Sequence, residues 1–160
     1  MATLLDETDT IYQASDFNRQ YRAILEAARA GVARVRDTDG TSLIVSREAR
    51  WGALQCVTTA AANFMPLEAA VGHACDRRPE LSEFGDWTWL RVFDHEELAE
   101  FVSEMREAIA IGAKEVSAAP VLDVLAAWRM TADSLEDPLS RETLLGPVDS
   151  AALEEVGRPE

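Results

Sequence analysis

The chain has 160 residues, room for one ordinary domain or for a small domain with an appendage. Its hydrophobic content of 48% excludes a wholly disordered protein, and no apolar run reaches the roughly 18 residues that a membrane span needs. The formal net charge of −14 excludes a protein that simply coats nucleic acid. Two cysteines are too few for a disulfide scaffold, and residues 1–9 carry no basic leader, so we expect a cytoplasmic protein.

The charge is unevenly distributed along the sequence. Residues 11–55 hold seven arginines and five acidic residues, a net of +2. Residues 56–160 hold eight basic and twenty-one acidic residues, a net of −13. This division indicates two different partners for the two parts of the chain, with solubility of an acidic protein as the alternative explanation.

The first elements are a short strand and a helix. Residues 10–13 predict the strand, because they include β-branched and aromatic side chains. Ser15 predicts the N-cap of the helix, and Gly31 predicts its end as a glycine after the last turn. One face of this helix is apolar, at Phe17, Tyr21, Ile24, Leu25 and Ala28.

A β-hairpin is predicted next. Residues 32–36 and 41–45 are short runs with strand character, and the Asp39-Gly40 pair between them is typical of a hairpin turn. Ser46 after the second run predicts the N-cap of another helix.

That helix is expected to run through an alanine-rich stretch to Phe64, with Pro66 interrupting or kinking it before a second apolar segment at 67–74. Residues 76–86 are polar, contain proline and glycine, and are the best candidate for a linker. The following segment, 87–93, is rich in aromatic residues.

The C-terminal part reads as two helices and a tail. Asp94 with Glu97 three residues later forms a capping-box pattern for a helix that is expected to end near Gly112. A further helix is expected over 120–135, and residues 136–160 are expected to be extended or partly disordered.

These elements predict an α+β fold. A small N-terminal α/β domain of strand, helix, hairpin and helix precedes a mainly α-helical C-terminal region. We place the first domain, with its following helix, at residues 1–75 and the acidic helical region with its tail at 87–160.

The order strand, Ser-capped helix, glycine, hairpin and Ser-capped helix resembles the N-terminal domain of prevent-host-death (Phd/YefM) antitoxins. The likeness covers residues 10–55, about a third of the chain. It is carried by Ile11, Ala14-Ser15-Asp16, Gly31, Val32 to Arg36, Leu43-Ile44-Val45-Ser46 and Glu48. The resemblance implies a homodimer whose paired sheets bind a palindromic operator, and a C-terminal segment that wraps and inhibits a cognate toxin.

The resemblance also implies DNA-binding residues. The contacting position at the start of the first helix falls on Asn18, where the family often has arginine, with Arg19 beside it and Arg22 one turn on. The basic residue at the end of the second strand falls on Arg36, and Arg34 lies on the same face of that strand. Guanidinium groups suit phosphates and guanine edges, and a two-fold dimer presents each set twice. The alternative is that these arginines are only a solvated surface.

The acidic C-terminal region is predicted to bind the toxin, which we expect to be basic, RelE-like or similar. Large aromatic side chains often dominate protein interfaces, so toxin contacts are predicted at Trp87, Trp89, Phe93, Phe101 and Trp128. The alternative is that these residues form a core, since they lie in apolar stretches. Toxin contact would then use the outer face of the helices or the tail after Pro138.

No enzyme, metal site or cofactor is expected. His73, Cys75 and Cys56 have irregular spacing without a second paired motif, which falls short of a zinc site. Acidic pairs such as Glu96 and Glu100 lack a companion histidine. The sequence also lacks a Gly-rich phosphate loop and a nucleophile elbow.

The leading hypothesis is therefore the antitoxin of a type II toxin–antitoxin system. It would neutralise a toxin by direct binding and repress transcription of its own operon as a DNA-binding homodimer. The alternative is a dimeric interaction adaptor that has lost operator binding. A small-ligand sensor is a third hypothesis, supported only by the size of the helical region.

Overall fold

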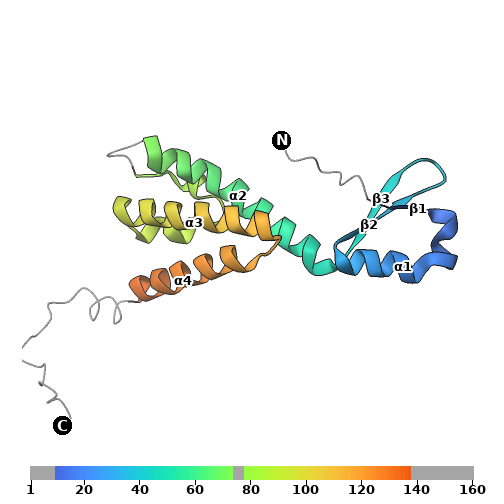
Figure 1. Ribbon diagram of the computed structural model, residues 1–160. Coiled ribbons are helices and arrows are strands. Elements are labelled where there is room, and N and C mark those ends of the chain that lie inside the picture. Colours follow the sequence, from blue (N-terminus) through green and yellow to red (C-terminus); the bar gives the residue numbers. More distant parts are fainter. Residues whose placement is uncertain (1–9, 74–77, 138–160) are drawn as a thin grey trace, which may run out of the picture.

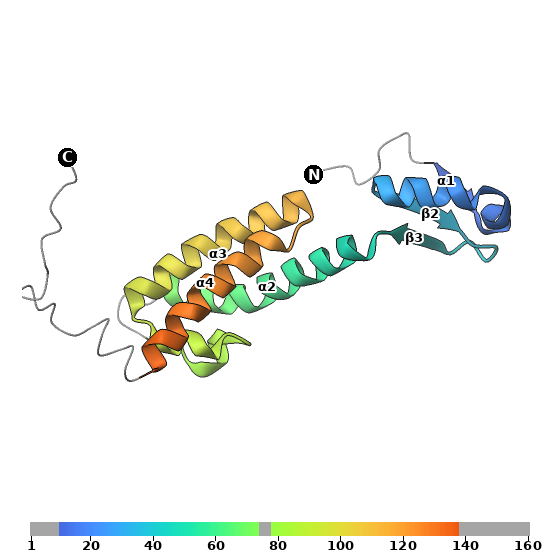
Figure 2. The ribbon, with the colours of Figure 1, turned by 90° about the horizontal axis from the view of Figure 1, so that it is seen from below.

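The computed structural model describes residues 10–73 and 78–137 and has an α+β fold. A small sheet and one helix form a head (residues 10–46) at one end of the molecule, and helices form a body (residues 56–137) at the other. Helix α2 (Glu48–His73) runs from the head into the body, as Figures 1 and 2 show from two directions. No helix in the described ranges is long and apolar enough to cross a membrane.

The head contains a sheet with strand order β1-β2-β3, formed by β1 (Ile11–Gln13), β2 (Val32–Arg36) and β3 (Ser42–Ser46). β1 is parallel to β2, and β2 is antiparallel to β3. The predicted Asp-Gly hairpin is confirmed: Gly40 has φ 89° and donates its N–H to the Asp37 carbonyl at 3.0 Å. This left-handed conformation favours glycine, because it lacks a Cβ.

Helix α1 (Phe17–Ala30) covers one face of the sheet. Ile24 and Ala28 on the helix pack against Ala33 and Val35 on β2, and these residues form the buried core of the head. Because the chain leaves β1, runs through α1 and returns in β2, the helix is antiparallel to both strands. The start of α1 and the end of β2 therefore lie at the same end of the head.

The two ends of α1 differ from the sequence expectation. Ser15 lies inside a 3-10 turn, η1 (Ala14–Asp16), and the residue before α1 is Asp16, whose side chain makes no capping bond. Gly31 does end the helix, but with φ 172°, which is extended backbone rather than the expected left-handed cap. Likewise Ser46 is the last residue of β3, and the next helix begins at Glu48.

α2 is one helix of 26 residues that runs through Pro66 without interruption, contrary to the expected break. Pro66 removes one backbone donor, but Phe64, Leu67 and Val71 on either side of it are all buried in the body core. Burial of one continuous face therefore outweighs the local effect of proline. It also places these residues of α2 in the body, whereas the sequence analysis assigned them to the N-terminal domain.

The expected linker at 76–86 is packed where the structure describes it. Residues 81–84 form a 3-10 helix, η2 (Leu81–Phe84), in which Phe84 is buried in the body core. Gly85 follows with φ 54°, and Asn63 on α2 donates a hydrogen bond to Asp86 at 3.1 Å. This segment thus packs against α2 through Phe84, and its polar residues lie mostly on the exposed side.

The body is completed by η3 (Thr88–Val92), α3 (His95–Glu115) and α4 (Ala119–Glu136). The predicted capping box of α3 is confirmed: the Glu97 N–H donates to Asp94 at 2.9 Å, and the Asp94 N–H donates to Glu97 at 2.8 Å. The helix continues past Gly112 to Glu115. Gly112 is instead a point of close approach, since a Cβ there would lie 2.8 Å from the Ser117 carbonyl oxygen. Residues 138–160, the expected tail, lie outside the described residues.

Candidate nucleic-acid interface and partner surfaces

The DNA-contact candidates on α1 are all exposed. Arg19 forms an ion pair with Asp16 at 3.2 Å, yet its side chain stays 79% exposed. Arg22 donates from Nε to the Tyr21 hydroxyl at 3.1 Å, and its guanidinium lies 5.8 Å from the centroid of that ring. Exposed contacts of this kind contribute little to stability and are readily exchanged. The guanidinium groups therefore remain accessible to a ligand.

The candidates on β2 lie on the opposite face of the head. Ala33 and Val35 point toward α1, and side chains alternate along a strand, so Arg34 and Arg36 point to the face that α1 leaves uncovered. We call this the open face of the sheet. Arg34 is half-buried on it, whereas Arg36 is exposed at the end of the strand.

The structure brings four of the five candidates to one end of the head. Asn18, Arg19 and Arg22 lie in the first turns of α1, and Arg36 lies at the end of β2, where the helix begins. This end, next to the hairpin turn, is the end of the head away from α2 (Figures 1 and 2). We call this end, with Asn18, Arg19, Arg22 and Arg36, the distal end of the head. Arg34 is set further back, on the open face.

The distal end also carries negative charge in the hairpin turn, at Asp37 and Asp39. The Thr41 backbone N–H donates to the Asp39 carboxylate at 2.8 Å. Hydrogen bonds from Thr41 hold the pKa of Asp39 below its ordinary value, so this carboxylate stays ionised at neutral pH. A phosphate approaching Arg36 would therefore meet anionic neighbours.

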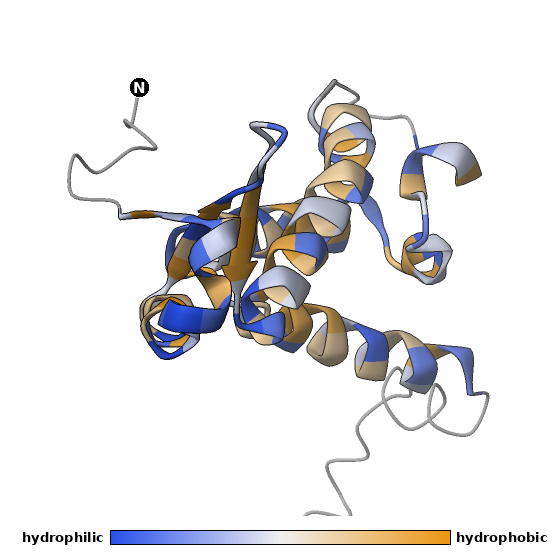
Figure 3. Ribbon diagram, turned by 90° about the vertical axis from the view of Figure 1, so that its right-hand side faces the viewer, coloured by the Kyte–Doolittle hydropathy of each residue, from blue (hydrophilic) through white to orange (hydrophobic). Residues whose placement is uncertain are grey.

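A second feature of the head is a set of large apolar side chains that it leaves exposed. Ile44 is 63% exposed and Trp51, in the first turn of α2, is 61% exposed. The full set in this part of the chain is Ile11, Phe17, Tyr21, Leu25, Leu43, Ile44, Trp51 and Leu54. Seen from the head end in Figure 3, hydrophobic colouring runs along a strand below a hydrophilic hairpin turn. Exposed apolar side chains of this size mark an interaction site where they form a contiguous patch.

The open face of the sheet carries two of these exposed apolar side chains. The strand register places Ile11, Arg34 and Ile44 side by side in one row across the sheet. No element of the described chain covers this row, although isoleucine is among the residues most often buried. The sequence signal that could have revealed it is the apolar run Leu43–Val45, because consecutive apolar residues in a strand require cover on both faces.

The predicted toxin-contact aromatics form an edge-to-face cluster in the body. Phe101 is fully buried, and its ring centroid lies 5.6 Å from that of Trp87 and 5.5 Å from that of Trp128. Phe93 is also buried, 5.0 Å from Trp128. Trp87, Phe93 and Phe101 are therefore core residues of this structure rather than surface anchors, the alternative that the sequence analysis left open.

The half-buried members of the cluster are engaged by charged residues. The Trp128 Nε1–H donates to Glu104 on α3 at 2.7 Å. The Arg129 guanidinium lies 5.5 Å from the Trp89 ring centroid. These contacts give the indoles partners at the edge of the core, as expected for rings with one polar end.

The outer surface of the body is acidic. α3 contains six acidic and two basic residues, and Glu96, Glu100 and Glu107 are exposed on its outer side. Glu104 on the same helix instead accepts a hydrogen bond from Trp128 at the edge of the core. The acidic surface and the distal end of the head lie at opposite ends of the molecule (Figure 1).

Within residues 10–73 and 78–137, no three His, Cys, Asp or Glu side chains are grouped so as to hold a metal ion. Cys56 is a half-buried free thiol. Cys75 and the side chain of His73 lie outside the described residues.

Comparisons of the chain with protein-family models, with curated proteins and with solved structures found no match. The proposed function therefore depends on the geometry and charge of these surfaces.

Proposed function

We propose that the protein is the antitoxin of a type II toxin–antitoxin pair, acting as a homodimer that binds operator DNA through the head and a basic toxin through the body. The observation that carries this proposal is the division of surfaces between the two ends. The head combines uncovered apolar side chains with exposed arginines, whereas the body has a closed core and an acidic outer surface.

A homodimer accounts for the uncovered side chains of the head. Ile44 and Trp51 would gain cover from a second copy, and burial of such a side chain stabilises by about 1.5–3 kcal/mol. A two-fold axis that runs along the length of the head would place two distal ends on the same side of the dimer, which suits a palindromic site with half-sites about one helical turn apart.

The decisive experiment is co-expression of the gene with its immediate neighbour, followed by purification through a tag on this chain. We expect a stable complex, and we expect the neighbour to be toxic alone and harmless in company. Neither complex nor toxicity would contradict the antitoxin function.

A second candidate, a dimeric interaction adaptor without operator binding, is favoured by one observation. The arginines of the distal end have acidic neighbours, since Asp16 pairs with Arg19 and the ionised Asp39 lies in the turn after Arg36. A salt-sensitive shift of the gene's own promoter fragment by the purified dimer would exclude the adaptor, because phosphate contacts make binding fall steeply with salt.

A further inference from the structure

A groove lies between α2 and α3 on the surface of the body. Its volume is about 620 Å³, and its lining is apolar or small except for one ion pair. The lining residues are Met65, Glu68, Ala69, Val71, Gly72, Ala99, Val102 and Arg106. The aromatic cluster takes no part in it, so this surface is separate from the predicted toxin-contact residues.

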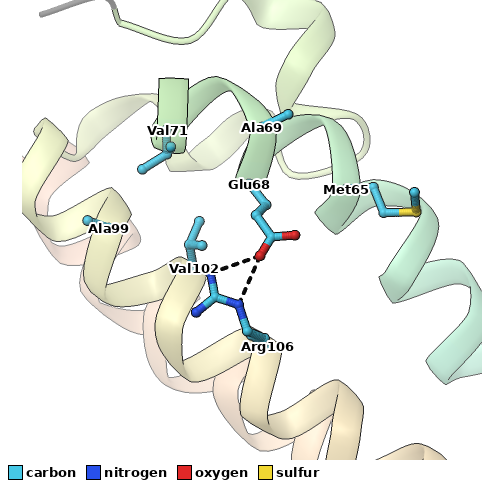
Figure 4. A pocket seen from close by; sticks show the side chains of 8 residues that line it. Met65, Glu68, Ala69, Val71, Ala99, Val102 and Arg106 are labelled. Atoms are coloured by element: carbon cyan, nitrogen blue, oxygen red, sulfur yellow. Dashed lines mark hydrogen bonds and ion pairs between the residues drawn. The ribbon is translucent and has the colours of Figure 1, made fainter. Parts of the chain in front are cut away.

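One edge of the groove carries an ion pair between its two helices. Glu68 on α2 and Arg106 on α3 reach toward each other and form an ion pair at 2.8 Å (Figure 4). Their charges cancel, so the local charge is set by the exposed glutamates of α3. Glu96, Glu100 and Glu107 occupy the face of α3 next to the lining row of Ala99, Val102 and Arg106.

The other walls suit the close approach of a helix. Met65 is 67% exposed at the groove, and methionine is common at surfaces that bind helical segments because its thioether adapts to different partners. A Cβ added at Gly72 would meet no atom within 4 Å, so the space above this residue is open. Ala69 and Ala99 also line the groove, and their small side chains leave room for a helix to approach.

We propose that this groove binds an amphipathic helix of a protein partner whose apolar face carries flanking lysine or arginine residues. An apolar floor next to an acidic helix face matches such a segment in both shape and charge. A second copy of this chain is disfavoured as the occupant, because it would bring its own acidic α3 toward the same glutamates. The inference deepens the proposed function, since a basic toxin is the partner that the antitoxin assignment supplies.

The test uses the full chain and a labelled synthetic peptide of about 18 residues, with leucine at helical spacing and lysine on the flanks. We expect saturable binding that weakens with salt, and none for a peptide in which glutamate replaces lysine. M65K, which places a positive charge in the apolar groove and repels the lysines of the peptide, and G72L, which fills the groove without altering charge, should each weaken binding at least tenfold. The matched control is M130K, because Met130 is 72% exposed on α4 and does not line the groove.

Equal loss in M130K, or unchanged binding in both M65K and G72L, would overturn the proposal. Conversion of a dimer to a monomer by M65K and G72L, with peptide binding unchanged, would assign the groove to a second copy and also overturn it. The two proposals can fail separately. A toxin complex that persists in G72L would contradict the role of the groove and leave the antitoxin function standing. Peptide binding without any complex with the neighbouring gene product would support the groove and contradict the antitoxin function.

Discussion

The head and the body bury their apolar side chains in different ways. The body encloses Phe84, Phe93, Phe101 and Leu90 within a layer of helices and 3-10 turns. The head buries Ile24, Ala28, Ala33 and Val35 between one helix and one side of a sheet, and leaves the other side open. Within the described residues, the body thus covers its core from more than one side with elements of one chain.

The difference indicates where binding partners act. A sheet covered on one side only, with Ile11 and Ile44 on the other, leaves apolar area in water that a second chain can cover. The body offers a partner charged residues and a shallow groove instead. We therefore expect substitutions in the body core to act on the stability of the monomer, and substitutions on the open face to act on association.

The largest effect should follow from F101A. Phe101 is fully buried and contacts Trp87, Trp89 and Trp128 edge to face. Truncating a buried phenylalanine costs about 3–5 kcal/mol through lost transfer energy and a cavity. Urea denaturation should show this loss in the free energy of unfolding, whereas M130A on the exposed side of α4 should change it by less than about 0.5 kcal/mol. Similar effects of both substitutions would contradict the closed core.

I44D should act on association instead. Ile44 is 63% exposed in the row across the open face, so an aspartate there is solvated in the monomer. A dimer would have to remove water from this carboxylate and from Arg34 beside it, which opposes association. Loss of a central apolar contact costs about 2 kcal/mol or more, and each substitution counts twice in a two-fold dimer. Sedimentation should show dissociation in I44D and none in L81D, a control on the body with 64% exposure. A dimer in both variants would move the interface away from the open face.

Two glycines sharpen the contrast within the body. G112A should destabilise by about 1–3 kcal/mol, because its Cβ would lie 2.8 Å from the Ser117 carbonyl oxygen and 3.0 Å from Val57. G72A has open space at the same point of its side chain and should gain up to about 1 kcal/mol from helix propensity. Thermal unfolding of the two variants measures both signs. A stabilised G112A would mean that the turn between α3 and α4 can shift freely.

Local chemistry predicted part of this fold and missed the rest for a physical reason. The hairpin at Gly40 and the capping box at Asp94 depend only on residues a few positions apart, and both are confirmed. The interruption expected at Pro66 is absent, and residues 78–86 of the expected linker are packed on the body, because burial against distant helices decided both. Such burial is a sum over partners that sequence spacing does not identify.

The candidate site divides in the same way. Alternation along β2 places Arg34 and Arg36 on one face of the sheet. The helical period would also place Arg19 and Arg22 together, but non-helical backbone at Gln20, with φ −118° and ψ 16°, kinks α1 between them. The arginines of β2 and those of α1 lie on opposite faces of the head because of how α1 packs on the sheet, and no local sequence pattern predicts that packing. Phe101 illustrates the remaining gap: an aromatic residue in an apolar stretch suits a core or an interface equally well until its neighbours are placed.

R36A should reduce operator binding by about tenfold per site and lower the slope of log affinity against log salt by about 1 for each phosphate contact removed. Arg36 is exposed at the distal end and contributes nothing to the core, so folding and toxin neutralisation should be unaffected. R129A is the matched control, since Arg129 is exposed on α4 and pairs with Asp133. Equal loss of DNA binding and neutralisation in a folded R36A would contradict the division of labour between head and body.

The smallest expected effect concerns the acidic hairpin turn beside Arg36. Hydrogen bonds from Thr41 lower the pKa of Asp39, so the carboxylate should titrate below its ordinary value in an NMR pH titration. A depressed pKa stabilises the fold above the unfolded value, and that contribution is lost as the pH falls through the folded value. D39N should therefore remove a little acid sensitivity and, by deleting one negative charge near Arg36, strengthen operator binding by less than tenfold. A pKa at or above the ordinary value would mean that Thr41 does not hold this carboxylate.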